Sequence, residues 1–192
     1  MDKDKLIEEL MADSRNKTYS KKGLGPIFQL NKECKILIIG QAPGKKVEET
    51  GILFNDKSGD RLCEWMGISK KTLYSKDISI MPMDFYYPGK AKSGDKPPRK
   101  FIARDYHPLF LENLTKVKLK VLLGLHANKY YLKDGFKKNL TQTIKDYESY
   151  LPEIFPLIHP SGLNNRWISK NPFFESKILP ALKRVVDDTL KS

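Results

Sequence analysis

The apolar positions of the chain gather in four short runs, and each run predicts a buried β-strand. The first spans residues 35–39, reads Lys-Ile-Leu-Ile-Ile and ends at Gly40. The other three span residues 77–81, 119–125 and 153–158. A short run that is apolar on both faces is typical of a strand covered by helices on both sides, as in a parallel sheet.

Amphipathic segments between and around these runs predict helices, at about residues 4–12, 58–66, 104–115 and 126–134. A final helix carries apolar residues at helical spacing, namely Phe174, Ile178, Leu182, Val185, Val186 and Leu190. Asn171 and Pro172 suit its N-cap and first turn, and Pro180 is expected to kink it or to start a new helix. Strands that alternate with helices predict a three-layer α/β/α sandwich around a central four-stranded parallel sheet.

The length of 192 residues suits one domain, with residues 1–30 as an N-terminal helix and a polar, glycine-rich lead-in loop. No apolar window is long enough to predict a membrane span, and the charged N-terminus lacks the apolar run of a signal peptide. The 2 cysteines, Cys34 and Cys63, are too few for a disulfide framework or an all-cysteine metal site. We therefore expect a cytoplasmic protein with reduced thiols.

The charge balance adds a class of partner. Lys and Arg total 35 against 23 acidic residues, which gives a net charge of +12. Such a field attracts polyanions, of which DNA is the leading candidate, although a solvated basic surface would give the same count. The long loop of residues 82–100 interleaves aromatic and basic residues, a combination used to bind nucleic acid, and its candidate DNA contacts are Lys92, Lys96 and Arg99.

Two motifs follow the first and last predicted strands. Residues 40–44 read Gly-Gln-Ala-Pro-Gly, and residues 159–163 read His-Pro-Ser-Gly-Leu. The first suits a tight turn whose backbone amides face a ligand, and the second places a histidine at a strand end. Each motif alone also fits a turn without chemistry. Together they would converge over one crevice, because ligands of parallel sheets bind beyond the carboxyl ends of the strands.

These motifs resemble motifs 1 and 3 of the uracil-DNA glycosylase superfamily. Residues 51–59 (Gly-Ile-Leu-Phe-Asn-Asp-Lys-Ser-Gly) also resemble the G-x-x-F-x-x-x-x-G segment of its GxAPG-type members, and the resemblance runs from about residue 36 to residue 190. It implies a DNA glycosylase of base excision repair. Such an enzyme flips uracil or a related deaminated base into a pocket and hydrolyses its N-glycosidic bond.

The resemblance also implies roles for particular residues. Phe54 would stack on the flipped base, His159 would donate a hydrogen bond to the departing base, and Leu163 would enter the vacated base stack. Gln41 and its neighbouring amides would face the base or the attacking water. The remaining assignments are Gly40, Ala42, Pro43, Gly44 and Asp84 for the substrate pocket, and Ser161, Gly162, Asn164 and Arg166 for the DNA backbone.

The chain departs from the family in the first motif. The better-known branch has an Asp where this chain has Ala42, and the thermophilic branch has a Glu where it has Gln41. A neutral amide can orient water but cannot take its proton or supply a countercharge. Either the bond breaks dissociatively with help from DNA phosphates, or another carboxylate (Asp56, Asp60 or Asp84) serves, or the activity is low.

Two further departures concern the cofactor and the base. Two cysteines cannot hold the iron–sulfur cluster of the thermophilic branch, so we expect no cluster, metal or other cofactor. No Asn stands at the motif 2 position within residues 78–84. Uracil selectivity would then rest on Asp84, Ser79 or backbone groups, or the substrate is another base.

Three hypotheses for function remain after these comparisons. The first is a glycosylase that acts on DNA, and we expect it to be a monomer. It is expected to be monofunctional, because no lysine is placed by a motif as a Schiff-base nucleophile. The second is a catalytically weak DNA-lesion-binding protein of the same fold. The third is an α/β enzyme acting on free nucleotides or RNA, and the basic loop and Leu163 argue against it because a small substrate requires neither.

Overall fold

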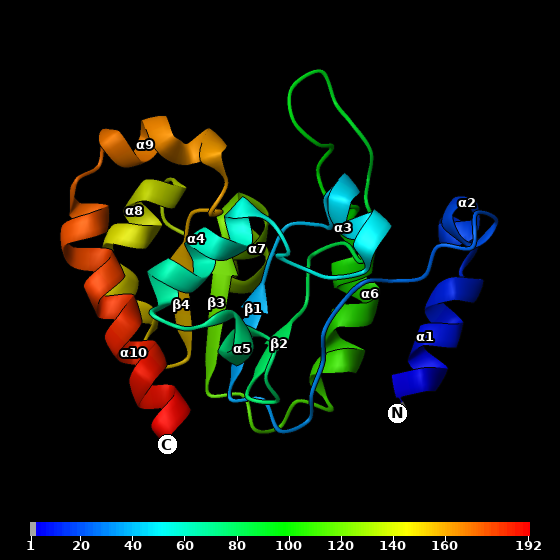
Figure 1. The fold of residues 1–192 in the computed structure, drawn as a ribbon, viewed down its shortest axis with the longest axis horizontal. Helices are drawn as coiled ribbons and strands as arrows, with labels where there is room; N and C mark the ends of the chain where they lie inside the picture. Colours follow the sequence, from blue (N-terminus) through cyan, green and yellow to red (C-terminus); the bar gives the residue numbers. More distant parts are fainter. Residues whose placement is uncertain (1–2) are drawn as a thin grey trace.

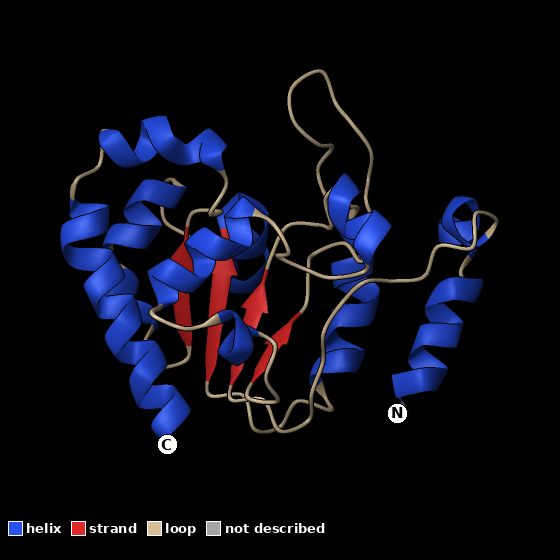
Figure 2. Cartoon of the chain, viewed as in Figure 1, coloured by secondary structure: helices blue, strands red, loops and turns tan. Residues whose placement is uncertain are grey.

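The computed structural model describes residues 3–192, and its centre is a parallel sheet (Figures 1 and 2). The strands are β1 (Ile36–Ile39), β2 (Ile78–Ile80), β3 (Leu119–Leu123) and β4 (Ile154–Leu157). They lie in the order β2-β1-β3-β4, and every neighbouring pair is parallel. All four predicted strands are therefore confirmed, each slightly shorter than its apolar run.

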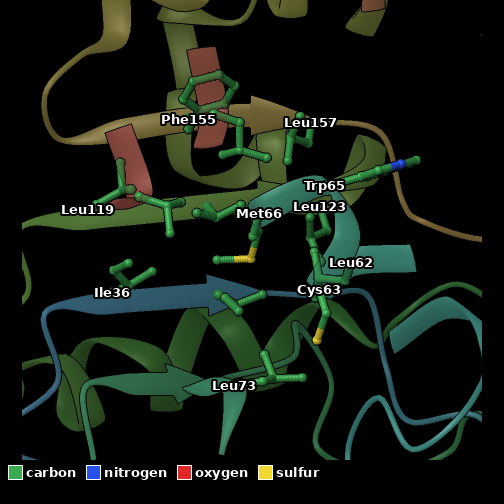
Figure 3. Packing of buried hydrophobic residues seen from close by; sticks show 14 of the residues in the cluster. Ile36, Leu62, Cys63, Trp65, Met66, Leu73, Leu119, Leu123, Phe155 and Leu157 are labelled. Atoms are coloured by element: carbon green, nitrogen blue, oxygen red, sulfur yellow. The ribbon is translucent and has the colours of Figure 1, made fainter. Parts of the chain in front are cut away.

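Helices cover both faces of this sheet and confirm the three-layer α/β/α sandwich (Figure 2). Alternate side chains of β1 point to opposite faces, so Ile36 and Ile38 enter one core while Leu37 and Ile39 enter the other. The first core lies under α4, α5 and α10. Figure 3 shows Met66 of α4 turned toward the strands that carry Ile36 and Leu123. The second core lies under α1, α6 and α7.

The helices are α1 (Lys3–Ala12), α2 (Lys17–Ser20), α3 (Lys45–Thr50), α4 (Lys57–Met66), α5 (Lys70–Leu73), α6 (Lys100–Leu111), α7 (Gly124–Leu132), α8 (Leu140–Lys145), α9 (Asn165–Ser169) and α10 (Leu179–Lys191). The long ones match the predicted helices, although α6 begins and ends earlier than expected. Periodicity missed α2, α3, α5, α8 and α9, because a helix of four to six residues shows too little of the helical repeat. Within the described residues, no helix is long and apolar enough to cross a membrane.

The C-terminal helix starts where its proline suggested. A π-helical turn, Phe174–Ile178, precedes α10, and Pro180 occupies the first turn of α10. A proline there costs no hydrogen bond because the first amides of a helix have no partner within it. Pro180 therefore marks a new start rather than a kink.

His107 of α6 fixes the chain at the end of β2. Its Nε2 lies 3.0 Å from the carbonyl oxygen of Pro82, and its Nδ1 lies 2.7 Å from the Tyr131 hydroxyl. A carbonyl only accepts hydrogen bonds, so Nε2 carries the proton and Nδ1 accepts from Tyr131. The ring is fully buried, and this burial lowers the pKa of His107 to about 4.

This buried histidine should make the folded state sensitive to acid. In the unfolded chain His107 takes up a proton below its ordinary pKa of 6.5, whereas the folded protein resists protonation down to about 4. The contribution of His107 to the free energy of unfolding is therefore fully present above pH 6.5. It is lost as the pH falls toward 4, and the loss is roughly 3 kcal/mol. His107→Gln keeps an amide donor for Pro82 and removes the titration. The free energy of unfolding, measured in urea across this pH range, should depend less steeply on pH for the variant than for the parent protein. An unchanged pH dependence would contradict the assignment.

Candidate active site

A cavity of about 340 Å³ opens beyond the carboxyl ends of the strands. Figure 1 shows α3, α9 and a projecting loop, residues 88–98, at this same edge of the sheet. The lining residues come from the turn after β1, helix α3, the end of β2, the start of α4 and the segment before it, the projecting loop and the segment after β4. They are Gly40, Gln41, Ala42, Pro43, Gly44, Val47, Leu53, Phe54, Asp56, Ser58, Pro82, Asp95, Lys96, His159, Ser161, Leu163 and Asn164.

Phe54 has a backbone conformation that few side chains adopt. Its φ is 56°, in the left-handed region, and such residues persist only where their surroundings hold them. Lys70 Nζ donates to the carbonyl oxygen of Phe54 over 2.7 Å. A Cβ at Gly59 would lie 1.8 Å from that same oxygen, so only glycine permits the close approach of this carbonyl to α4. The Phe54 ring in turn lies beside Gly40, where a Cβ would stand 3.6 Å from Cζ.

His159 faces the same cavity from the end of β4. Its ring and the Phe54 ring have centroids 6.3 Å apart and planes inclined by 29°. Gly124, with φ of 83°, leaves room for His159, because a Cβ there would lie 3.5 Å from the histidine Cβ. Burial lowers the pKa of His159, and Asp56 partly opposes this shift. His159 is therefore neutral at physiological pH and can present one N–H to a ligand.

The segment after His159 is held in shape by side chains on both sides. Asn164 Nδ2 donates to the His159 carbonyl oxygen over 2.7 Å, and Ser161 Oγ accepts from the amide of Leu163 over 3.2 Å. Arg61 of α4 donates to the Ser161 carbonyl oxygen over 3.2 Å and to Asn165 Oδ1 over 2.8 Å. These bonds fix the loop without using the side chain of Leu163.

Leu163 stands at the rim of the cavity with 83% of its surface exposed. Among the described residues, the next most exposed large hydrophobic side chain is Ile52, at 46%. Exposure of an apolar side chain to water is unfavourable relative to its burial. Its position beside a cavity suits contact with an apolar surface of a ligand.

The sequence profile of the Uracil DNA glycosylase superfamily matches residues 27–183, most of the chain. The chain belongs to the uracil DNA glycosylase superfamily. The match contains the turn at residues 40–44, Phe54 and the segment that begins at His159, so the family assignment from these motifs is confirmed. Members of this superfamily are glycosylases that act on DNA in base excision repair.

Asp84 and Arg99 do not line this cavity. Asp84 is fully buried, and its two oxygens accept from Arg99 Nε over 2.7 Å and Nη2 over 2.8 Å. Arg99 also donates to Asn16 Oδ1 over 2.8 Å and lies over the ring of Tyr19. The pair ties the base of the projecting loop to the N-terminal segment. We therefore assign both residues a structural role in place of the ligand contacts expected from the sequence.

The other predicted DNA contacts lie around the cavity rim or beyond it. Lys96 lines the cavity, and its amide donates to the Gly89 carbonyl oxygen over 2.8 Å across the projecting loop. Lys92 is exposed in the same loop, and Arg166 is exposed on α9. Gly162 is exposed between the two lining residues Ser161 and Leu163. Lys96 is therefore the basic residue of this set that lines the cavity, while Lys92 and Arg166 are exposed outside its lining.

Sequence motifs missed three residues that shape the site. Arg61 and Lys70 act on segments far from them in the chain, so no local pattern reveals them. Asn128 is fully buried in α7, and its Nδ2 donates to the carbonyl oxygens of Leu122, Gly124 and Leu157. It thereby joins the ends of β3 and β4 below His159. A polar residue on the buried face of α7 was the available signal.

Metal ligation has no support in the part of the chain that the structure describes. No group of three or more His, Cys, Asp or Glu side chains there could hold a metal ion. Cys34 and Cys63 are both buried, and they lie in the two different cores on opposite faces of the sheet.

The Asp84–Arg99 pair should be far more important for stability than an exposed lysine of the same loop. Arg99→Ala would leave the Asp84 carboxylate buried without its counter-charge, which typically costs about 3–5 kcal/mol. Lys92→Ala is the matched control, because its exposed side chain has no such partner and should change little. The free energies of unfolding in urea provide the measurement. Equal losses for the two variants would contradict the structural role.

Proposed function

We propose that this protein is a monofunctional DNA glycosylase that hydrolyses the N-glycosidic bond of uracil or a related deaminated base in DNA. The main support is that Phe54 and His159 line one cavity and that Leu163 is exposed at its rim. A flat aromatic ring, a neutral hydrogen-bond donor and an apolar wedge are the groups that base flipping and base release require.

Base flipping accounts for the cavity and for its rim. An enzyme cannot reach a glycosidic bond inside a stacked duplex, so the target nucleotide must leave the stack. The cavity of about 340 Å³ has room for one base, with the Phe54 ring available for stacking. Leu163 would fill the space that the flipped base vacates and so slow its return.

Base release accounts for His159. When the C1′–N bond breaks, negative charge grows on the base, and a donor already in place stabilises it. Such a donor is commonly worth about 3–4 kcal/mol in the transition state. Because burial keeps His159 neutral, it donates a hydrogen bond without carrying a charge of its own. Gln41, which also lines the cavity, would orient the attacking water.

DNA binding accounts for the charge. The net charge of +12 favours a polyanion, and Lys96 at the cavity and Lys92 beyond it would contact phosphates on one side. Ser161, Asn164 and Arg166 would contact the backbone on the other side of the flipped nucleotide. A free nucleotide would need neither the wedge nor the extended basic rim.

The identity of the base depends on what the end of β2 contributes to the cavity. From the end of β2 the cavity receives Pro82, while the side chain of Met81 is buried in the core on the other face. No side-chain amide therefore reads the base from this strand. We propose that stacking, cavity shape and backbone groups select among deaminated bases.

A second candidate function is lesion binding with weak catalysis. One observation favours it, namely that the turn at residues 40–44 brings Gln41 and Ala42 to the cavity without a carboxylate. On that alternative the same cavity would hold a flipped base without efficient cleavage.

Base release separates the two candidates. Oligonucleotides carrying one uracil, hypoxanthine or xanthine are incubated with the protein, and alkali then cleaves any abasic site. The proposal predicts release that falls roughly 10²–10³-fold in His159→Ala. His126→Ala is the control, because His126 does not line the cavity. No release from any oligonucleotide, together with salt-sensitive DNA binding, would favour the lesion-binding alternative.

The wedge role of Leu163 predicts a dependence on strandedness. Leu163→Ala should reduce release from duplex DNA much more than release from single strands, because only the duplex has a stack to refill. Met11→Ala removes another exposed apolar side chain, on α1, and should leave the ratio of the two rates unchanged. Equal losses on both substrates would remove the wedge from the mechanism.

A further inference from the structure

The first motif of this chain supplies no carboxylate to the cavity, so the charge that usually balances the positive sugar must come from elsewhere. Among residues 3–192, the acidic residues that line the cavity are Asp56 and Asp95. Asp95 lies in the projecting loop, where its Oδ1 accepts from the Tyr87 hydroxyl over 3.2 Å and pairs with Lys90 over 3.4 Å. Lys90 therefore already balances the charge of Asp95.

The other acidic candidates near the motif are turned away from the cavity. Asp60 is on α4 with a side chain 72% exposed, and it pairs with Lys70 over 3.2 Å. Asp84 is fully buried in its pair with Arg99. Neither one lines the cavity.

Asp56 is fixed by hydrogen bonds to one carboxylate oxygen, and its other oxygen, Oδ2, remains available to a ligand. It is the N-cap of α4, and its Oδ1 accepts from the amides of Ser58 over 2.9 Å and Gly59 over 3.0 Å. Within residues 3–192, no group donates a hydrogen bond to Oδ2 and no cation pairs with it. The residue lies two positions after Phe54, in the segment that Gly59 and Lys70 hold in place. Its charge is also close enough to His159 to act on that ring.

We propose that Asp56 is the catalytic carboxylate of this enzyme, replacing the one that the first motif lacks. The C1′–N bond breaks, and its electron pair leaves with the base, which His159 stabilises by a hydrogen bond. The negative charge of Asp56 stabilises the cationic sugar. The oxygen of a water molecule then bonds to C1′, its proton passes to Oδ2 of Asp56, and the departed base takes a proton from solvent. This role rests on the proposed function, since it needs a glycosidic bond in the cavity.

Asp56→Asn tests the charge while keeping the helix cap. Asn is as good an N-cap as Asp, so α4 and the Phe54 segment should remain folded. Single-turnover base release should fall roughly 10²-fold or more. Asp60→Asn is the matched control on the same helix, and it should keep the parental rate because Asp60 faces away. Urea unfolding of both variants verifies that they remain folded.

A second readout does not depend on turnover. DNA with a cationic pyrrolidine at an abasic position mimics the charged sugar, and a tetrahydrofuran at the same position is its neutral counterpart. The parent protein should bind the cationic DNA more tightly, and Asp56→Asn should lose this preference while Asp60→Asn keeps it. A parental rate and preference in Asp56→Asn would overturn the proposal for Asp56 and leave the proposed function standing. If the parent releases no base at all, the proposed function fails and the catalytic role of Asp56 fails with it, whereas a parent that releases base with an unaffected Asp56→Asn variant overturns the role of Asp56 alone.

Discussion

The carbonyl oxygen of Phe54 occupies the place where a side chain of residue 59 would stand, and the architecture of the cavity depends on this contact. With glycine at 59, the first turn of α4 approaches the preceding segment closely enough to hold Phe54 at a positive φ. Lys70 secures the same carbonyl from α5. One close approach thereby sets the aromatic wall of the cavity and places Asp56 at the start of α4, two residues further on.

The parallel sheet brings the other half of the site to this wall. Because all strands end at one edge, the turn after β1 and the segment after β4 meet there, although they are far apart in sequence. Asn128 and Gly124 adjust the ends of β3 and β4 so that His159 fits against them. The common direction of the strands and a few backbone contacts thus bring the Phe54 ring and the His159 donor to one cavity.

The sequence predicted the features that depend on local pattern. Apolar runs located all four strands, and the two motifs at strand ends meet at one cavity, which Gln41 and His159 both line. Short helices such as α3 and α9 could not be predicted, because their few residues carry almost no periodic signal. Long-range pairs were also out of reach. A buried Asp84 and an exposed one look alike in sequence, and Arg99 in a basic loop resembles a phosphate contact until its partner is known.

In the proposed mechanism, a flipped base lies in the cavity between the stacking ring of Phe54 and the donor of His159. A crystal structure of the protein with duplex DNA carrying 2′-fluoro-deoxyuridine tests it most directly, because fluorine at C2′ destabilises the cationic sugar and preserves the bond. We expect the uracil ring inside the cavity, stacked on Phe54, with a carbonyl oxygen about 3 Å from a ring nitrogen of His159. A base that stays in the duplex, or that binds away from Phe54 and His159, would contradict it.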